Sequence, residues 1–384
     1  MNFKLDDAQL DLVAATRTLA SREWGGDAIH SPSQGLPRPV LRLLAAQGLS
    51  GISLPEGIGG QSRALLDAVL VLEAVAEISV VAGDCIQALN FGAIQQIAAH
   101  GSPEVLRRFL RPALAGAKLV TVAMTEPDAG SGVTDLRTRA TRNGANIVLD
   151  GQKIFTSNAD SADYFVVWSR FGAEPRDAGA IIVERDTPGF TVDSSHRFAS
   201  GESYGVLYFE NCEVPGENVL LDTDGFGRMF MVFNIERLGN AARSLAVGQA
   251  ALNLAVKHVR ERKQFGRRLV DFQGLQWRLA EMELQLQGAR LLLYRAAANA
   301  AGGKPSATEA CLAKLACNRA GFEVANQALQ MFGGYGFDDQ AALTYLFLRT
   351  RGWMIAGGTV EQMLNRIAES VIGERISQRP QQKS

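Results

Sequence analysis

The 384-residue sequence lacks the features that mark several common classes of protein. Its 39 lysines and arginines balance 40 aspartates and glutamates, so the formal net charge is -1 and no basic surface for nucleic acid is indicated. No apolar run approaches the roughly 18 residues of a membrane-spanning helix, and the acidic N-terminus lacks the basic-then-apolar pattern of an export signal. We therefore expect no nucleic-acid partner and no membrane association.

Cysteine and histidine are scarce and scattered. The four cysteines form no C-x-x-C pair, and the four histidines show no metal-ligand spacing. Free thiols of this kind are typical of a cytoplasmic protein, and no metal site is expected. No G-x-G-x-x-G follows a predicted strand either, which disfavours a nicotinamide site of the Rossmann type.

The sequence divides into three blocks. Residues 1–117 fit helices, including a single apolar helix from Ala88 to His100. Residues 118–222 hold short apolar runs separated by turn residues, which predict strands. Residues 223–384 hold long periodic runs with short links, which predict an antiparallel four-helix bundle. The expected fold is mainly α, with a small central β-domain, a barrel or a sandwich, between two helical domains.

The longest apolar-periodic run, residues 225–268, predicts a helix that carries Glu236 near its start. On this helix Glu236 shares a face with Phe233. Apolar neighbours destabilise an ionised carboxylate and raise its pKa, as an active-site base requires. A surface glutamate paired with a neighbour such as Arg243 or Asn240 is the alternative, and periodicity alone favours that alternative.

Four motifs follow one another along the chain: AMTEPDAGS, DGQKIFTSNADSADYFVV, ERKQFGRRLVDFQ and QMFGGYGF. Each one alone also fits an ordinary turn, strand or helix end. In this order, and across helical, β and helical blocks, the sequence resembles the acyl-CoA dehydrogenase family over nearly its whole length. The resemblance implies FAD as cofactor. A strand and loop would hold the flavin ring, while a guanidinium and a glycine-rich turn would meet the pyrophosphate and adenosine.

The resemblance assigns FAD contacts to residues in every motif. The first two motifs supply Met124, Thr125, Gly130, Ser131, Phe155, Thr156 and Ser157. The last two would reach the FAD of a neighbouring subunit through Arg262, Gln264, Phe265, Phe272, Gln273, Gln330, Met331, Phe332, Gly333 and Gly334. Near the C-terminus, the set is completed by Thr359 and Glu361. Cofactor sites shared between subunits imply a homo-oligomer, either a tetramer or a dimer.

The sequence departs from the family pattern at the catalytic base. Most members carry this base in a C-terminal E-G-T motif, but Gly357 stands at that place in IAGGTVEQM. A minority, including isovaleryl-CoA and long-chain acyl-CoA dehydrogenases, has a glutamate before an arginine on the long helix, which FNIERLG matches with Glu236 and Arg237. The loss at one place together with the gain at the other makes Glu236 the expected base. Ala356 stands where a tyrosine is common, which removes bulk from the acyl pocket.

The resemblance implies α,β-dehydrogenation of an acyl-CoA or a related acyl thioester. Glu236 would take the α-proton while hydride leaves the β-carbon for flavin N5. Substrate contacts are expected from Ser131, Arg237 and Gly357, with the backbone N–H of Gly357 polarising the thioester carbonyl. Electron-transfer flavoprotein is the expected electron acceptor. Two alternatives stay open: a flavin monooxygenase or oxidase on the same fold, and a non-catalytic partner subunit.

Overall fold

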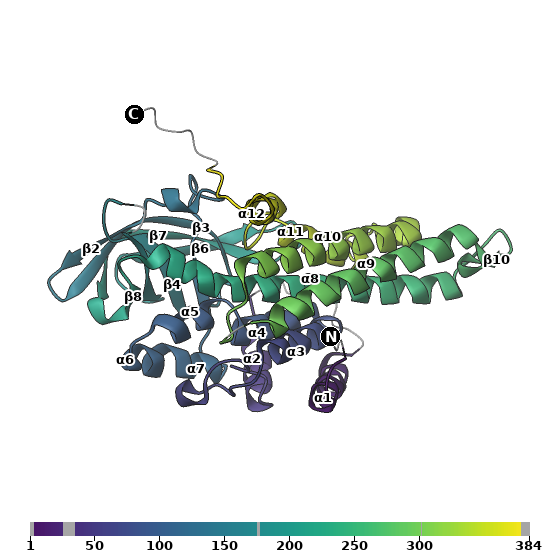
Figure 1. Cartoon of the computed structure of the whole chain (residues 1–384), viewed down its shortest axis with the longest axis horizontal. Coiled ribbons are helices and arrows are strands. Elements are labelled where there is room, and N and C mark those ends of the chain that lie inside the picture. The colour runs from purple at the N-terminus through teal and green to yellow at the C-terminus, as the bar shows by residue number, and fades with distance from the viewer. Residues whose placement is uncertain (1–3, 26–34, 175–176, 301, 378–384) are drawn as a thin grey trace.

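The computed structural model describes residues 4–25, 35–174, 177–300 and 302–377. Figure 1 shows an elongated molecule with a β-sheet at one end and long helices that run to the opposite end. The N-terminal helices pack along one side of the sheet and of the long helices. This arrangement confirms the predicted fold of two helical domains with a central β-domain.

The N-terminal helices are organised around α3 (Leu65–Ala76), in which every residue is buried. The others are α1 (Asp7–Trp24), α2 (Arg38–Ala46), α4 (Val80–Asn90), α5 (Ala93–His100), α6 (Pro103–Val105) and α7 (Arg111–Leu114). A helix that is apolar on every side belongs in a core. Accordingly, α3 packs against α1 and α4 on one side and against helices of the C-terminal bundle on the other.

The predicted single helix from Ala88 to His100 is wrong, because the chain breaks between α4 and α5. Gly92 at the break has a φ of +63°, a left-handed conformation that glycine adopts without strain. A Cβ atom at this position would lie 2.9 Å from Oε2 of Glu236. The break therefore lies where a distant helix brings a carboxylate against the chain, which no local sequence pattern reveals.

The β-domain is one hydrogen-bonded sheet with the strand order β6-β7-β3-β2-β4-β5-β8, and β1 pairs in parallel with β4. The strands are β1 (Val120–Ala123), β2 (Arg139–Asn143), β3 (Asn146–Ser157), β4 (Tyr164–Arg170), β5 (Ala178–Glu184), β6 (Phe190–Arg197), β7 (Ser203–Pro215) and β8 (Val219–Leu221). Trp168 of β4 packs edge-on against Phe230 and Phe233 of the long helix α8. This contact fixes the start of α8 on the sheet.

The C-terminal bundle is built on α8 (Gly225–Glu261). Packed around it are α9 (Gln273–Ala298), α10 (Ala307–Phe332) and α11 (Ala342–Trp353), while α12 (Val360–Ile372) packs on α10. A short hairpin, β9 (Lys263–Gln264) and β10 (Arg267–Arg268), lies at the end of the bundle far from the sheet (Figure 1).

Two features are absent from the residues that the structure describes: a membrane-spanning helix and a cluster of metal-binding side chains. Within the described ranges, no helix has both the length and the apolar character needed to cross a membrane. In the same part of the chain, no group of three or more His, Cys, Asp or Glu is arranged to hold a metal ion.

Candidate active site

Glu236 lies on α8 where this helix passes the break between α4 and α5. Gln87 Nε2 donates a hydrogen bond of 2.7 Å to Oε2 of Glu236, and the Glu236 side chain is only 20% exposed. Burial raises the pKa of Glu236 to about 6, although Arg243 and the hydrogen bond from Gln87 act in the opposite direction. A carboxylate with this pKa is ionised at neutral pH and is more basic than an exposed one, which suits a general base.

Gln87 is a residue of this site that the sequence analysis missed. A Cβ atom at Gly239, on the next turn of α8 after Glu236, would lie 2.2 Å from Oε1 of Gln87. The absence of a side chain at Gly239 therefore provides the space that the Gln87 amide occupies. Oε1 of Gln87 is buried and has no hydrogen-bond partner among the described residues. The amide is thus held on its Nε2 side by Glu236 alone.

Arg243, the alternative ion-pair partner of Glu236, is mainly engaged elsewhere. Its Nη2 lies 3.9 Å from Oε1 of Glu236, whereas its Nη1 lies 2.7 Å from Oδ1 of Asp84. Arg349 binds the other oxygen of Asp84 at 2.5 Å and lies 3.2 Å from Oε1 of Glu202. This buried network joins α4, α8, α11 and the loop between β6 and β7. Glu236 is therefore not a surface glutamate, and its charge is only partly compensated.

Arg237 is buried, and none of the described carboxylates forms an ion pair with it. Its Nη1 donates a hydrogen bond of 2.6 Å to Oδ1 of Asn234. The guanidinium also lies over the rings of Phe230 and Phe233. A Cβ atom at Gly358 would lie 3.9 Å from Nη2 of Arg237. Arg237 thus packs beside the turn between α11 and α12, and burial lowers its pKa.

Gly357 and Gly358 form this turn with φ values of +72° and +93°. No described residue accepts a hydrogen bond from the N–H of Gly357. A Cβ atom at Gly357 would lie 3.5 Å from Cε of Lys314 and 3.8 Å from Nδ2 of Asn240. The charge of Lys314 also lowers the pKa of Glu236, so this lysine lies against the turn and interacts electrostatically with the glutamate. Lys314 and Asn240 are further residues that the sequence analysis missed.

The two segments expected at the flavin ring lie side by side. The N–H of Ile154 donates a hydrogen bond of 2.9 Å to the carbonyl of Thr125, and the hydroxyl of Thr121 donates one of 2.8 Å to the carbonyl of Ser157. The structure therefore brings the first motif against the second. Among the other residues expected in the first motif, Met124 is half-buried, and Gly130 and Ser131 are exposed.

Thr156 differs from its neighbours on β3. Phe155 is 52% exposed, and its ring lies 5.1 Å from that of Tyr204. Ser157 is also exposed, whereas Thr156 is 1% exposed and its hydroxyl is buried without a described partner. Phe155 has a φ of +56°, and the pairing register of β3 with β7 shifts between Lys153 and Thr156, so β3 is irregular at this point. Of the three residues expected along the ring, Thr156 therefore has its side chain buried, while Phe155 and Ser157 expose theirs.

A buried ion pair that the sequence analysis also missed joins the same two motifs. Lys153 Nζ lies 2.7 Å from Oε1 of Glu126 and 3.1 Å from the carbonyl oxygen of Met124. Burial alone would raise the pKa of Glu126, but Lys153 and hydrogen bonds from Thr138 and the backbone of Arg137 hold it below its ordinary value. Removing one partner would leave an unpaired buried charge. The pair therefore holds the first loop against β3. The presence of Glu126 in the first motif and Lys153 in the second was the only sequence feature that could have indicated it.

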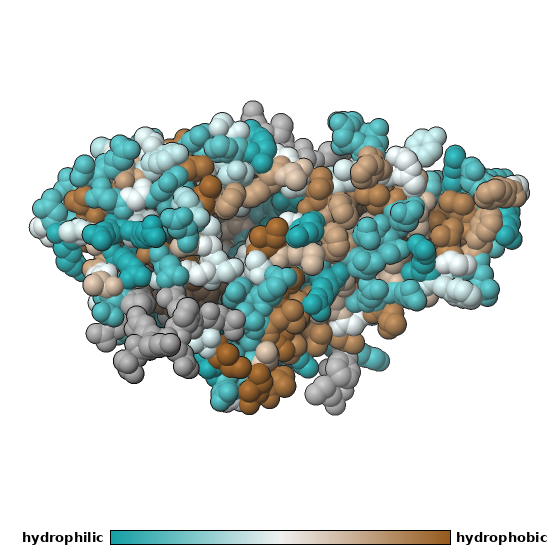
Figure 2. Space-filling model, turned by 90° about the horizontal axis from the view of Figure 1, so that it is seen from above, coloured by the Kyte–Doolittle hydropathy of each residue, from teal (hydrophilic) through white to brown (hydrophobic). Residues whose placement is uncertain are grey.

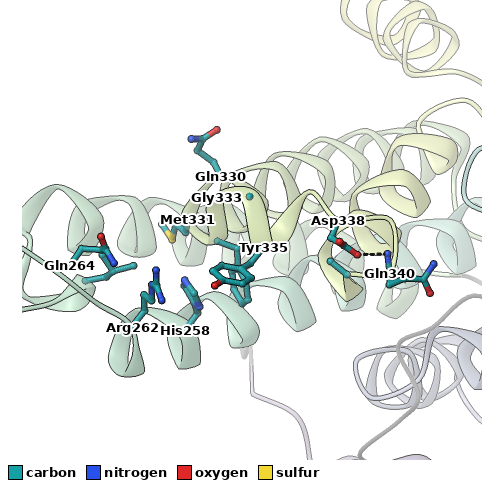
Figure 3. A pocket seen from close by; sticks show the side chains of 13 residues that line it. His258, Arg262, Gln264, Gln330, Met331, Gly333, Tyr335, Asp338 and Gln340 are labelled. Atoms are coloured by element: carbon teal, nitrogen blue, oxygen red, sulfur yellow. Dashed lines mark hydrogen bonds between the residues drawn. The ribbon is translucent and has the colours of Figure 1, made fainter.

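Many of the other expected residues line a cavity of about 780 Å³ near the hairpin end of the bundle (Figure 3). Its lining comes from the C-terminal end of α8 and from the end of α10 with the turn that follows: His258, Arg262, Gln264, Leu269, Gln330, Met331, Phe332, Gly333, Gly334, Tyr335, Asp338, Gln340 and Ala341. Arg262 lies over the ring of Tyr335, and His258 stacks on Phe332. A guanidinium, amides, aromatic rings and a glycine-rich turn together fit a pyrophosphate and an adenine.

Five of the FAD residues expected from the last two motifs and from the C-terminal helix are not in this lining. Phe265 is 93% exposed on the hairpin. Phe272 lies directly before α9 and Gln273 is its first residue, and neither lines the cavity. Thr359 caps α12 by accepting a hydrogen bond from the N–H of Gln362, and Glu361 is exposed in the first turn of that helix. Conversely, the sequence analysis did not assign several lining residues: His258, Leu269, Tyr335, Asp338, Gln340 and Ala341.

Comparison with known families assigns the class of protein. Three family models match consecutive parts of the chain: the acyl-CoA dehydrogenase N-terminal domain at residues 6–117, the middle domain at 121–212 and the C-terminal domain at 223–372. Together with the site they define a flavoprotein oxidoreductase. The chain belongs to the acyl-CoA dehydrogenase family.

Individual relatives extend over nearly the whole chain. The 3-sulfinopropanoyl-CoA desulfinase of Paraburkholderia xenovorans is 33% identical over 98% of this chain and 99% of its own. The benzylmalonyl-CoA dehydrogenase of Aromatoleum aromaticum is 32% identical over 97% of this chain and 100% of its own. Among solved structures, butyryl-CoA dehydrogenase from Megasphaera elsdenii has a TM-score of 0.90 at 28% identity, covering 97% of this chain and 100% of its own. The predicted family and the predicted class of enzyme are confirmed.

Proposed function

We propose that this protein dehydrogenates an acyl-CoA, or a related acyl thioester, between its α and β carbons, with FAD as cofactor and Glu236 as the base. The observation that carries the proposal is the partly buried carboxylate of Glu236 on the long helix, together with a glycine, Gly357, at the place of the base in most of the family. Its pKa of about 6 suits a base that works at neutral pH. The proposal thus includes the subgroup in which the long helix carries the glutamate.

Each residue around Glu236 has a separate role in this proposal. Bound FAD supplies the hydride acceptor. Glu236 accepts the α-proton, and the hydrogen bond from Gln87 to Oε2 leaves Oε1 for that proton. The free N–H of Gly357 donates to the thioester carbonyl, where enolate charge develops in the transition state. Arg237 supports the turn, and Ser131 contacts the substrate from the flavin loop.

The FAD contacts proposed for this chain lie in two separate places. The loop residues Met124, Thr125, Gly130 and Ser131, with the exposed face of Phe155 and Ser157, would hold the flavin ring. The cavity around Arg262 would hold the pyrophosphate and adenosine. Figure 1 shows the sheet and the β10 end of the bundle at opposite ends of the molecule. Two copies of the chain would therefore complete each FAD site, which supports a homo-oligomer; Thr359 and Glu361 remain proposed contacts.

Exposed apolar side chains on the bundle also support association between copies. Figure 2 shows apolar side chains among polar ones over the bundle half of one face. On α9, Trp277, Leu284 and Leu291 recur every seven residues, and each is more than half exposed. Residues with this spacing share one face of a helix, and a contiguous apolar face is typical of an interface. A dimer or a tetramer is proposed, with electron-transfer flavoprotein as the acceptor and the cytoplasm as the location.

Anaerobic titration of the FAD-loaded protein with a panel of acyl-CoAs tests the proposal. The panel includes saturated straight and branched acyl-CoAs, benzylmalonyl-CoA and 3-sulfinopropanoyl-CoA, and flavin bleaching is followed in the visible spectrum. At least one saturated acyl-CoA should bleach the flavin and yield the 2-enoyl-CoA. Sulfite release from 3-sulfinopropanoyl-CoA without bleaching by any other acyl-CoA would instead assign a desulfinase. An FAD-loaded protein that no acyl-CoA reduces would contradict the proposal.

A further inference from the structure

We infer that Lys314, Asn318 and Asn240 form a polar clamp that holds the Gly357–Gly358 turn in the conformation that presents the Gly357 N–H to the substrate. These three side chains, on α8 and α10, are called the turn clamp below. Its catalytic consequence rests on the proposed function, whereas the clamp itself is a property of the fold. The two can therefore be tested separately.

Lys314 is the centre of the turn clamp. Its side chain is completely buried in the bundle, and its Nζ makes three hydrogen bonds. It donates to Oδ1 of Asn318 at 2.8 Å, to the carbonyl of Trp353 at 3.2 Å and to the carbonyl of Gly358 at 2.9 Å. Trp353 is the last residue of α11, and Gly358 ends the turn. One ammonium group therefore binds both ends of the segment that carries Gly357.

The two asparagines extend the clamp to the middle of the turn. Asn318 Nδ2 donates to Oδ1 of Asn240 at 2.9 Å, and Asn240 Nδ2 donates to the carbonyl of Ala356 at 3.4 Å. Donors from the clamp thus reach the carbonyls of residues 353, 356 and 358. The N–H of Gly357 lies between two of these carbonyls in the sequence and has no acceptor among the residues that the structure describes. The clamp binds the turn through its acceptors and leaves this donor for a ligand.

The physical need for the clamp follows from the two glycines. Adjacent glycines have more accessible backbone conformations than any other pair, so ordering them costs more entropy. One backbone bond, from the N–H of Val360 to the carbonyl of Met354, also spans the turn, whereas the N–H groups of Ile355 and Ala356 both donate locally to the carbonyl of Gly352. Burying an ammonium group is itself costly, and burial lowers the pKa of Lys314 to about 7. Three well-formed hydrogen bonds offset that cost where they define the turn.

Lys314 is a positioning residue and not a second base or an ion-pair partner of Glu236. Its three N–H groups are all engaged by oxygens other than carboxylates. Besides burial, the charges of Arg237 and Arg243 lower the pKa of Lys314, whereas Glu236 and Cys311 raise it. The clamp acts on the reaction through the backbone. Loss of a single donor to an oxyanion typically lowers kcat by about 10²–10³-fold. This is the largest decrease in kcat that we expect when the turn is no longer held in place.

Amide hydrogen exchange of the FAD-loaded protein tests the clamp without substrate. Lys314→Met removes the ammonium group while keeping an unbranched side chain. We expect at least about 10-fold faster exchange at the N–H of Val360, which bonds to Met354 across the turn, and at the N–H groups of Ile355 and Ala356, which lead into it. Peptides from the middle of α8 should be unchanged. Thr350→Val is the matched control, because its buried hydroxyl bonds only to carbonyls of α11.

The catalytic consequence is measured with substrate. Lys314→Met should lower the rate of flavin reduction by about 10²-fold while the substrate dissociation constant changes by less than about threefold. The absorption band of a bound aryl-enoyl-CoA should also lose most of its red shift, since that shift reports polarisation of the thioester carbonyl. Lys314→Arg should recover part of both signals. A merely structural lysine would leave the red shift of the folded variant unchanged.

Each outcome decides one question. Unchanged exchange at the turn in folded Lys314→Met, or equal acceleration in Thr350→Val, overturns the clamp. If Lys314→Met shows faster exchange at the turn but keeps the wild-type red shift and the wild-type rate of flavin reduction, the catalytic role of the clamp is overturned. If Lys314→Met is not recovered as folded protein, Asn240→Ala, which loses the 3.4 Å contact to Ala356, carries the same tests. If no acyl-CoA reduces the wild-type flavin, the proposed function fails, and hydrogen exchange still decides the clamp.

Discussion

The two ends of α8 present two different kinds of site. Near its start, Glu236 accepts a hydrogen bond from Gln87 of α4, and the ion pairs of Asp84 with Arg243 and Arg349 join α4, α8 and α11 within the same chain. At its C-terminal end, Arg262 and the glycine-rich turn after α10 line an open cavity of about 780 Å³. The hairpin beside that cavity is exposed on every residue, including Phe265.

The difference separates chemistry from cofactor retention. A buried, nearly closed environment is what shifts the pKa of a carboxylate, so the catalytic end gains from being enclosed by its own chain. An exposed guanidinium keeps its ordinary charge and suits a pyrophosphate that arrives with another subunit. Mutations at the two ends should therefore change different measured quantities.

The largest effect is expected at the catalytic end. Glu236→Gln should lower the rate of flavin reduction by about 10²–10⁴-fold, the usual contribution of a general base, while the flavin spectrum and FAD content stay normal. Stopped-flow reduction under anaerobic conditions measures this rate. Retained reduction at the wild-type rate would remove Glu236 from the mechanism.

Moving the carboxylate sharpens the same test. Glu236→Gly combined with Gly357→Glu should recover part of the activity that Glu236→Gly loses. Recovery should be incomplete, because φ at position 357 is +72° and a side chain there costs roughly 1–2 kcal/mol. A double variant no faster than Glu236→Gly would show that the two positions do not reach the same atom.

The next effect is expected at the cofactor end. Arg262→Ala should weaken FAD binding by about 10–100-fold, since a hydrogen bond to a charged group contributes about 1.5–3 kcal/mol. Once saturated with FAD, the variant should keep the wild-type pH dependence of flavin reduction. Arg268→Ala on the same hairpin is the control, because Arg268 pairs with Asp271 and lies outside the cavity. Equal losses in both variants would contradict a specific role for Arg262.

Stability should depend on pH through Glu236. Its pKa in the folded protein, about 6, lies above the ordinary value of 4.5, so the folded state binds this proton more tightly than the unfolded state does. The resulting stabilisation is complete below pH 4.5 and is lost as the pH rises through 6. Glu236→Gln should therefore gain about 2 kcal/mol relative to wild type between pH 4 and pH 8, at 1.36 kcal/mol per pKa unit. Urea unfolding of both proteins measures the difference; a pH-independent difference would refute it.

The smallest effect tests the network behind Glu236. Asp84→Asn removes the main partner of Arg243, so the guanidinium charge acts more strongly on Glu236 and lowers its pKa. The acid limb of the pH–rate profile should move to lower pH by up to about one unit. Glu104→Gln, which breaks an exposed pair with Arg107, is the control. A shift to higher pH would show that Arg243 does not compensate Glu236.

Much of the architecture was accessible from local patterns. The 3.6-residue apolar period of α8 and the turn residues between the strands of the β-domain each depend on neighbours close in sequence. Strand β2, with the sequence RATRN, was missed because most of its residues are polar and exposed. The break at Gly92 was missed because the apolar pattern continues through it, and the close approach of Glu236 to this glycine comes from more than a hundred residues further along the chain.

The sequence by itself determined the family, the order of helical and β blocks, and Glu236 as the candidate base, because motifs and periodicity are local properties. Only the tertiary structure decided the environment of that base: the hydrogen bond from Gln87, the engagement of Arg243 by Asp84, and the turn clamp around Lys314. The physical reason is that burial and charge compensation depend on which segments meet in space. The pKa of a carboxylate is set by these neighbours, and none of them lies next to it in the chain.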